Sequence, residues 1–169
     1  CIRDRAKPCE LLLAAILCNN AKIENENMIG EPTEIALLRG AFTVMGDVRS
    51  EWKRVDEFAF TSERKMMSTL NKKEDMLVLY SKGAPEVILA KCTHVAIEKS
   101  IQNLTDEYKK QIEKHLSDYA SKGMRVMAFA KKSLEGEYVQ EALEENLVFL
   151  GLAALWDPPR KEVSSAVEE

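Results

Sequence analysis

The segment that most restricts the fold is 66–82, where two runs of apolar and β-branched residues flank the polar stretch NKKED (71–75). Such runs on either side of a short polar turn predict an antiparallel hairpin, with Lys72 and Lys73 at its tip. A similar run, EWKRVDEFAF (51–60), precedes the hairpin and predicts one more strand. The core of the fold is therefore expected to be an antiparallel sheet.

Two more strands and four helices complete the predicted elements. MRVMAFAKKS and NLVFLGLAALW (146–156) predict two further strands, and the second is apolar on both faces, which favours a central position. Four helices are predicted, namely CELLLAAILC after Pro8, the segment from Pro32 to Gly46, a short helix that starts at Pro85, and the helix that Thr105 caps and Lys122-Gly123 ends. Short helix pairs around a mostly antiparallel twisted sheet give the fold class α+β.

Composition limits the partners of the chain. Its 169 residues suit one domain. A net charge of −4 and a pI near 5.4 argue against nucleic acid and against direct membrane contact, because both partners favour a broad basic surface. The longest apolar runs, 11–18 and 147–156, are shorter than the roughly 20 residues of a membrane-spanning helix. An anionic ligand would have to be held by a few local cations.

The usual catalytic motifs are missing from the sequence. Its seven glycines never form GxGxxG or GxxxxGK, so nucleotide cradles of the Rossmann, kinase and Walker types are excluded. The sequence also contains no GxSxG, no HExxH and no dense aspartate cluster. No catalytic residue and no metal ligand are therefore predicted, and the chain alone is not expected to be a self-sufficient enzyme.

One lysine stands at an unusual place, between a predicted strand and a predicted helix. In LYSKGAPEVILAKC (79–92), Lys82 is followed by Gly83 and Ala84, where little side-chain cover would let a flat ligand approach the backbone. The N-terminus of the following helix favours anionic groups. On this stretch alone, a solvated lysine before an ordinary helix is the simpler interpretation.

Six motifs that occur in one order favour a different interpretation. They are LCNNA (17–21), GEPTE (30–34), FTSERKMMS (60–68), SKGAPE (81–86), KGMRVMAFA (122–130) and GLAALWDPPR (151–160). Together they resemble the nucleotide-binding domain of P-type cation-transporting ATPases, closest to the calcium-pump-like group, over nearly the whole chain. The resemblance implies that ATP binds on one face of the sheet.

The resemblance implies how the adenine would be held. Phe60 would stack on the base, which can contribute about 1–3 kcal/mol. Glu34 would accept a hydrogen bond from the exocyclic amine, and Met67 and Met127 would form apolar walls. Ordinary structural roles remain open for all four: sheet core for the phenylalanine and the methionines, and a surface position in a first helical turn for the glutamate.

The same resemblance implies which cations meet the nucleotide. Lys65 and Lys82 would line the pocket together with Gly83, and Arg125 would contact the phosphates. An arginine suits this role because its guanidinium is always charged and can bind phosphate oxygens with two hydrogen bonds. The alternative for Arg125 is a strand residue that faces solvent.

The resemblance also implies a division of labour between domains. Residues 1–156 would form the nucleotide-binding domain, and 157–169, with Asp157, Pro158, Pro159 and Arg160, would form a hinge that leads back into a phosphorylation domain. Mg-ATP would be the cofactor of the intact pump, with no metal held by this domain alone. The partners would be the phosphorylation and actuator domains of the same polypeptide.

The expected function is then to hold ATP by its adenosine end and to deliver the γ-phosphate to an aspartate on the phosphorylation domain. The chain would be the cytoplasmic domain of an integral membrane protein, an ATP-driven cation translocase, and would be inactive alone. The alternatives are an α+β interaction or regulatory module without nucleotide binding, and a free-standing nucleotide hydrolase.

Overall fold

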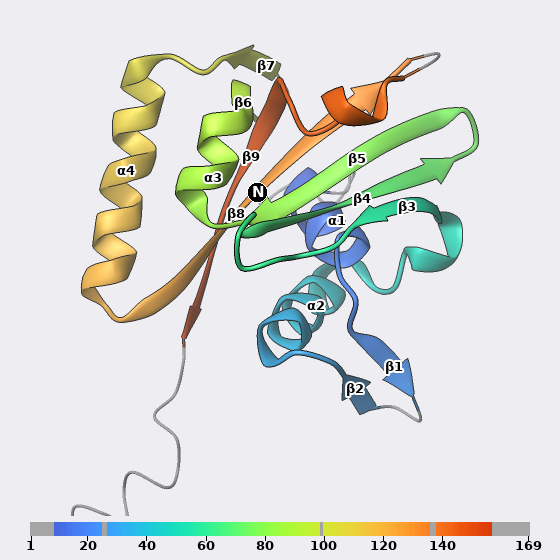
Figure 1. Ribbon diagram of the computed structural model, residues 1–169. Helices are drawn as coiled ribbons and strands as arrows, with labels where there is room; N and C mark the ends of the chain where they lie inside the picture. The colour runs from blue at the N-terminus through green and yellow to red at the C-terminus, as the bar shows by residue number, and fades with distance from the viewer. Residues whose placement is uncertain (1–8, 25–26, 99, 136–137, 157–169) are drawn as a thin grey trace, which may run out of the picture.

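The computed structural model describes residues 9–24, 27–98, 100–135 and 138–156 (Figure 1). The predicted hinge, Asp157 to Arg160, and the rest of 157–169 lie outside the described residues. Within the described ranges, no helix combines the length and the apolar character that a membrane span requires.

A seven-stranded sheet forms the centre of the structure, with the strand order β3-β4-β5-β8-β9-β6-β7. Its strands are β3 (Lys53–Phe58), β4 (Met66–Lys73), β5 (Met76–Gly83), β6 (Cys92–Ile97), β7 (Ser100–Asn103), β8 (Met124–Leu134) and β9 (Leu147–Trp156). All neighbours are antiparallel except β6 and β9, which run parallel. The predicted α+β class is confirmed, and β9 occupies a central position in the sheet as its two apolar faces indicated.

The predicted hairpin is formed by β4 and β5, which pair without interruption from Met66 opposite Gly83 to Lys73 opposite Met76. Its turn consists of Glu74 and Asp75, and Glu74 has a φ of 53°. A two-residue hairpin turn needs such left-handed backbone because it matches the twist of the strands. The expectation that Lys72 and Lys73 form the tip is therefore wrong, since both are still paired within the strand.

Two helices cover each face of the sheet, in agreement with the predicted helix pairs. The helices are α1 (Glu10–Leu17), α2 (Pro32–Met45), α3 (Pro85–Lys91) and α4 (Asp106–Ser121). One apolar cluster joins α1 and α2 to Tyr80 and Phe129, whereas a second joins α3 to Leu79 and Ala128 on the other face. Adjacent strand residues enter different clusters because successive side chains of a strand point to opposite faces.

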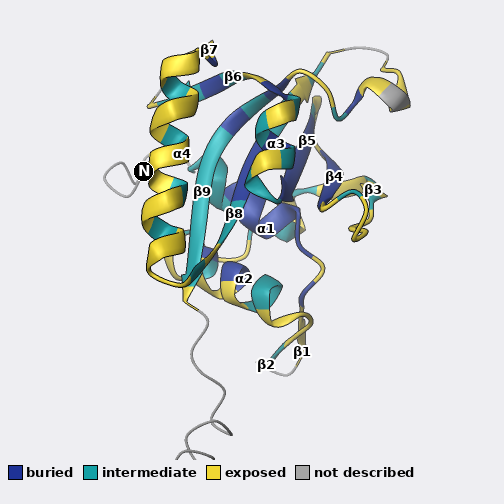
Figure 2. Ribbon diagram, turned by 60° about the vertical axis from the view of Figure 1, so that its left-hand side comes forward, coloured by how far each residue is buried: buried dark blue, intermediate teal, exposed yellow. Residues whose placement is uncertain are grey.

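The helix boundaries follow local chemistry. Pro32 and Pro85 occupy the first positions of α2 and α3, where a missing N–H costs no hydrogen bond. The Thr105 hydroxyl accepts a hydrogen bond from the backbone N–H of Tyr108 and so caps α4. In Figure 2, α1, β4 and β5 are largely buried, β9 is mostly of intermediate burial, and α4 is mostly exposed.

Smaller elements complete the described chain. Two short strands, β1 (Lys22–Glu24) and β2 (Asn27–Ile29), form a separate antiparallel pair that the sequence did not predict. Two 3-10 turns, η1 (Arg49–Glu51) and η2 (Gln140–Ala142), precede β3 and β9.

Candidate functional site

The sheet brings several of the predicted binding residues onto the face that α1 and α2 cover. Met67 of β4 lies directly opposite Lys82 of β5, and Lys82 lies opposite Phe129 of β8. Met127 stands two residues before Phe129 and therefore shares its face. Met67 is buried in the apolar cluster of this face and Met127 packs against it, so both have the core role that was the alternative for them.

Lys82 is not a solvated lysine, because it forms a buried ion pair. Its Nζ lies 2.6 Å from Oε1 of Glu34, and the two side chains are only 4% and 15% exposed. Glu34 belongs to the first turn of α2, and the same Oε1 accepts a hydrogen bond from the backbone N–H of Asn20. The simpler interpretation of Lys82 is therefore wrong, and two of the predicted site residues are in direct contact.

The turn that follows α1 holds Glu34 in place. The side-chain amide of Asn19 donates to the backbone oxygens of Ala15 and Glu34, at 3.1 and 2.9 Å. Its Oδ1 accepts a hydrogen bond from the backbone N–H of Ala21 at 2.8 Å. These bonds tie the end of α1 to the start of α2 and give Asn19 of LCNNA a structural role.

Arg54 adds a second restraint on this turn. Its Nη2 donates to the backbone oxygens of Leu17 and Asn19, at 2.8 and 2.7 Å, and so satisfies carbonyls at the C-terminal end of α1. Its Nη1 donates to Oδ1 of Asn20 and forms an ion pair with Glu57. Sequence reasoning missed Arg54 and Glu57, because only the strand register shows that they reach the turn.

Arg125 lies near the N-terminus of α2. Its Nη1 donates to Oγ1 of Thr33, the second residue of the helix, at 2.8 Å, and the residue is exposed. Arg125 precedes Met127 by two positions in β8 and therefore points to the same face of the sheet. The guanidinium and the positive end of the α2 dipole thus lie together, and both favour anions.

Phe60 and Lys65 lie in the connection 59–65 between β3 and β4. The Phe60 side chain is 56% exposed, so its alternative role in the sheet core is excluded. Lys65 is also exposed and has a φ of 53°. Its backbone oxygen accepts a hydrogen bond from the N–H of Ala84 at 2.9 Å, which joins the connection to the start of α3.

The close approach of two backbone segments requires a glycine at position 83. A Cβ atom at this position would lie 2.4 Å from the Lys65 oxygen and 2.7 Å from Cβ of Met66. Only glycine allows the two backbones to approach this closely. The space beside Gly83 is therefore filled by protein backbone, in contrast to the open approach for a flat ligand that the sequence suggested.

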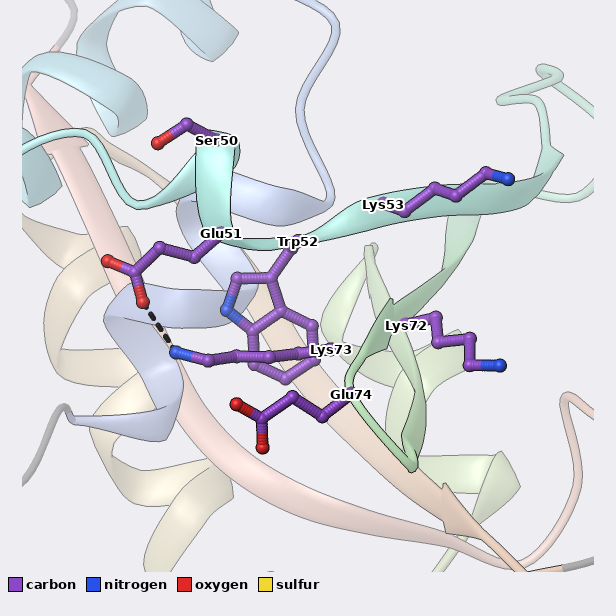
Figure 3. Close-up of a pocket in the computed structure, with 7 residues that line it drawn as sticks. All are labelled: Ser50, Glu51, Trp52, Lys53, Lys72, Lys73 and Glu74. Carbon is purple, nitrogen blue, oxygen red and sulfur yellow. Dashed lines mark hydrogen bonds and ion pairs between the residues drawn. The ribbon is translucent and has the colours of Figure 1, made fainter.

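Two hollows in the described structure lie away from these residues. One, of about 460 Å³, is at the far end of the hairpin and is lined by Ser50, Glu51, Trp52, Lys53, Lys72, Lys73 and Glu74. Figure 3 shows the Lys73 side chain beside the Trp52 ring, with its ammonium bonded to Glu51. The other, of about 370 Å³, lies between α3, α4 and β8. None of the predicted binding residues lines either hollow.

The buried cysteines near the sheet are unreactive. Burial raises the pKa of the Cys18 thiol from 9.0 to about 11, although the nearby Lys82 charge opposes the change. Burial alone raises the pKa of Cys92 to about 12. Both thiols stay protonated near neutral pH and are poor nucleophiles. Among the described residues, no three His, Cys, Asp or Glu side chains are grouped as a metal site requires.

Comparison with known proteins gives a consistent result. A family model described as "P-type ATPase, cytoplasmic domain N" matches residues 9–162. A calcium-transporting ATPase of Bacillus cereus is 38% identical over 163 residues, which cover 94% of this chain and 18% of that protein. The probable cation-transporting P-type ATPase of Mycoplasma genitalium is 39% identical over 165 residues, with 94% and 18% covered. A calcium-transporting ATPase of Lactococcus lactis is 34% identical, with 94% and 19% covered.

The chain thus spans less than a fifth of the length of these relatives. Its fold class, its ordered motifs and the extent of the family match agree with one another. The chain belongs to the family of the cytoplasmic N domain of P-type ATPases.

Proposed function

We propose that this chain is the ATP-binding domain of a P-type cation-transporting ATPase of the calcium-pump-like group. It holds ATP by the adenosine end, and closure of the domain delivers the γ-phosphate to an aspartate on a separate phosphorylation domain. The family match and the names of the relatives support this proposal. The transport activity, the use of Mg-ATP and the phosphorylation and actuator domains belong to the whole pump.

The ion pair between Lys82 and Glu34 is the observation that carries the proposal. Such a buried pair rarely stabilises a fold more than apolar residues of equal volume would, so stability alone does not account for it. It lies where the connection 59–65 joins the sheet, since Met67 pairs with Lys82 and Met66 with Gly83. A cation and a carboxylate at this junction, with Phe60 exposed in the connection itself, suit a base that carries both hydrogen-bond donors and acceptors.

The predicted residues then take distinct roles. Phe60 stacks on the adenine, Glu34 accepts from its exocyclic amine, and Lys82 forms the floor of the site. Arg125, an exposed cation, contacts the phosphates, and Lys65, which is also exposed, lines the pocket. None of these residues supplies a nucleophile or a general base, so the chain alone binds ATP without hydrolysing it.

Titration of the 169-residue chain with ATP, followed by NMR, tests the proposal. The phosphates meet only part of their final environment here, so we expect a dissociation constant within about a decade of 1 mM, equivalent to roughly −4 kcal/mol. Resonances around Lys82 and Phe60 should shift. Phe60→Ala should weaken binding by about 1–3 kcal/mol. Met76→Ala, at an apolar residue of similar exposure on the far end of the hairpin, is the matched control and should bind like the parent.

Three results would contradict the proposal. A chain that shows no ATP-dependent shifts at millimolar nucleotide would be an interaction module. Release of phosphate without any other domain would indicate a free-standing hydrolase. A folded Phe60→Ala variant with unchanged affinity would show that the roles assigned through the resemblance are misplaced.

A further inference from the structure

We infer that Glu144 is a positioning residue of the nucleotide site, which acts through Arg64 to hold Phe60 ready for the adenine. This inference rests on the proposed function, because it concerns the same site. Glu144 itself lies between η2 and β9, 84 positions after Phe60 in the sequence, and is not assigned any contact with the nucleotide.

Glu144 is bonded to both the connection 59–65 and the sheet. Nη2 of Arg64 lies 2.6 Å from Oε1 and 2.5 Å from Oε2 of its carboxylate, and the Glu144 side chain is only 17% exposed. The hydroxyl of Ser68 donates to the same Oε1 at 2.6 Å. Ser68 in turn shares a hydrogen bond of 2.8 Å with Ser81, its partner across β4 and β5. The carboxylate therefore anchors Arg64 to two strands of the sheet.

Arg64 is bonded to the residues on both sides of Phe60. Its Nη1 donates to the oxygen of Ala59 at 3.0 Å, and its backbone N–H donates to Oγ1 of Thr61 at 3.1 Å. The N–H of Lys65 donates to the Thr61 oxygen at 2.8 Å. Phe60 stands between these restrained residues, yet its side chain is 56% exposed. The backbone is held while the ring stays available.

The backbone conformation of Lys65 shows that the connection is constrained. A φ of 53° is unfavourable for a lysine and persists only where surrounding contacts enforce it. The bonds of Arg64 and the hydrogen bond from Ala84 supply such contacts. A ligand that stacks on a preformed aromatic residue does not have to order it, so affinity rises without any new contact. Loss of the Glu144 anchor should therefore weaken binding.

The neighbouring glutamate provides a matched control. Glu145 forms an ion pair of 2.7 Å with Lys91 at the end of α3, and no bond links its side chain to the connection 59–65 in the described structure. Glu145→Ala removes an ion pair one residue away without releasing Arg64. Glu144→Gln keeps the shape and the acceptor oxygen of the side chain while removing its charge, and it should give an intermediate effect.

Affinity measurements on the 169-residue chain test the inference. Glu144→Ala should raise the ATP dissociation constant about three- to fivefold, an effect of preorganisation rather than of contact, while Glu145→Ala leaves it unchanged. In a Phe60→Ala background, the added Glu144→Ala change should have no further effect, because coupled residues are not additive. A residue that only stabilises the fold would weaken binding equally in both backgrounds.

Limited proteolysis gives a readout that needs no nucleotide. Trypsin cleaves after lysine and arginine, and the connection contains both Arg64 and Lys65. In the native chain, Glu144→Ala should speed cleavage within 59–65 severalfold relative to Glu145→Ala, because cleavage tracks local opening. Thermal unfolding and NMR spectra check that each variant is folded. If Glu144→Ala does not fold, Glu144→Gln takes its place in both measurements.

The outcomes separate the inference from the proposed function. If the chain shows no ATP-dependent shifts at millimolar nucleotide, the proposed function fails, and the inference fails with it. If the chain binds ATP but Phe60→Ala binds it like the parent, ATP binding stands, the role of Phe60 is misplaced and the inference is overturned. If Phe60→Ala weakens binding but Glu144→Ala does not, the inference alone is overturned. An equal loss in the parent and Phe60→Ala backgrounds, or unchanged cleavage within 59–65, would likewise overturn it.

Discussion

Lys82 and Glu34 are 48 positions apart in the sequence, yet their side chains meet at 2.6 Å beneath the surface of the sheet. Each charge is thereby removed from water and depends on the other for compensation. Removing one partner of such a pair leaves a buried charge, whereas replacing both need not cost stability. This dependence leads to the first prediction.

Glu34→Gln should lower the free energy of unfolding by about 3 kcal/mol, because Lys82 loses its counter-ion. Lys82→Met, which keeps most of the volume, should also destabilise the chain. The double variant should recover much of the loss, and urea unfolding of the parent, both single variants and the double variant measures the coupling. Strictly additive losses would mean that the two charges do not depend on each other.

Lys82 and Arg125 should differ in the part of the nucleotide that they sense. Lys82 is buried at the base of the site and Arg125 is exposed near the N-terminus of α2. Lys82→Ala should therefore weaken AMP, ADP and ATP to similar extents, whereas Arg125→Ala should weaken ADP and ATP more than AMP. Calorimetry with the three nucleotides decides between these patterns, and the reverse result would exchange the two roles.

Gly83→Ala should destabilise the chain by about 1–3 kcal/mol, the usual cost of an overpacked site. The added methyl would meet the backbone oxygen of Lys65, which cannot rotate away. Gly40→Ala is the matched control, because the residue lies within α2 and its added Cβ meets nothing within 4 Å beyond its chain neighbours and the backbone of its own helix. We expect this second change to stabilise the helix by roughly 0.5–1 kcal/mol. Urea unfolding compares the two.

Stability should fall above pH 9, in part because of Cys18. Its pKa is about 11 in the folded chain and 9.0 for the ordinary thiol. The unfolded chain therefore loses this proton first, and stability that is fully present below pH 9 is lost as the pH rises towards 11. The difference corresponds to roughly 3 kcal/mol. Cys18→Ala should reduce the slope of unfolding free energy against pH in this window, and an unchanged slope would contradict the assignment.

The sequence predicted elements whose signals are local. The apolar and β-branched runs of 66–82 indicated the hairpin, and Pro32, Pro85 and Thr105 marked helix starts that the structure confirms. The strands β1 and β2 were missed because each has three mostly exposed residues, too few for a recognisable pattern. The position of the hairpin turn was harder to predict, because Lys72 and Lys73 are still paired within β4 and the turn consists of Glu74 and Asp75.

Contacts across long separations could not be predicted. Lys82 was singled out by its place between a predicted strand and helix, and Glu34 through the family resemblance. Only the register of β4, β5 and β8 and the packing of α2 show that they form a pair. Arg64 and Glu144 gave no signal as partners, because nothing in their spacing links two segments 80 residues apart. The proposed hinge at Asp157 to Arg160 stays a prediction.

The position of β9 in the sheet affects the order in which the strands can pair during synthesis. In the order β5-β8-β9-β6-β7, the strands β6 and β7 join the rest of the sheet only through β9. During synthesis, β3, β4, β5 and β8 can pair as they leave the ribosome, whereas β6 and β7 must wait, already translated, for a strand that follows them by about fifty residues. Their unpaired edges are a hazard for aggregation in that interval. Completion of the sheet, and of the core beneath α3, is therefore a late step that depends on the last strand.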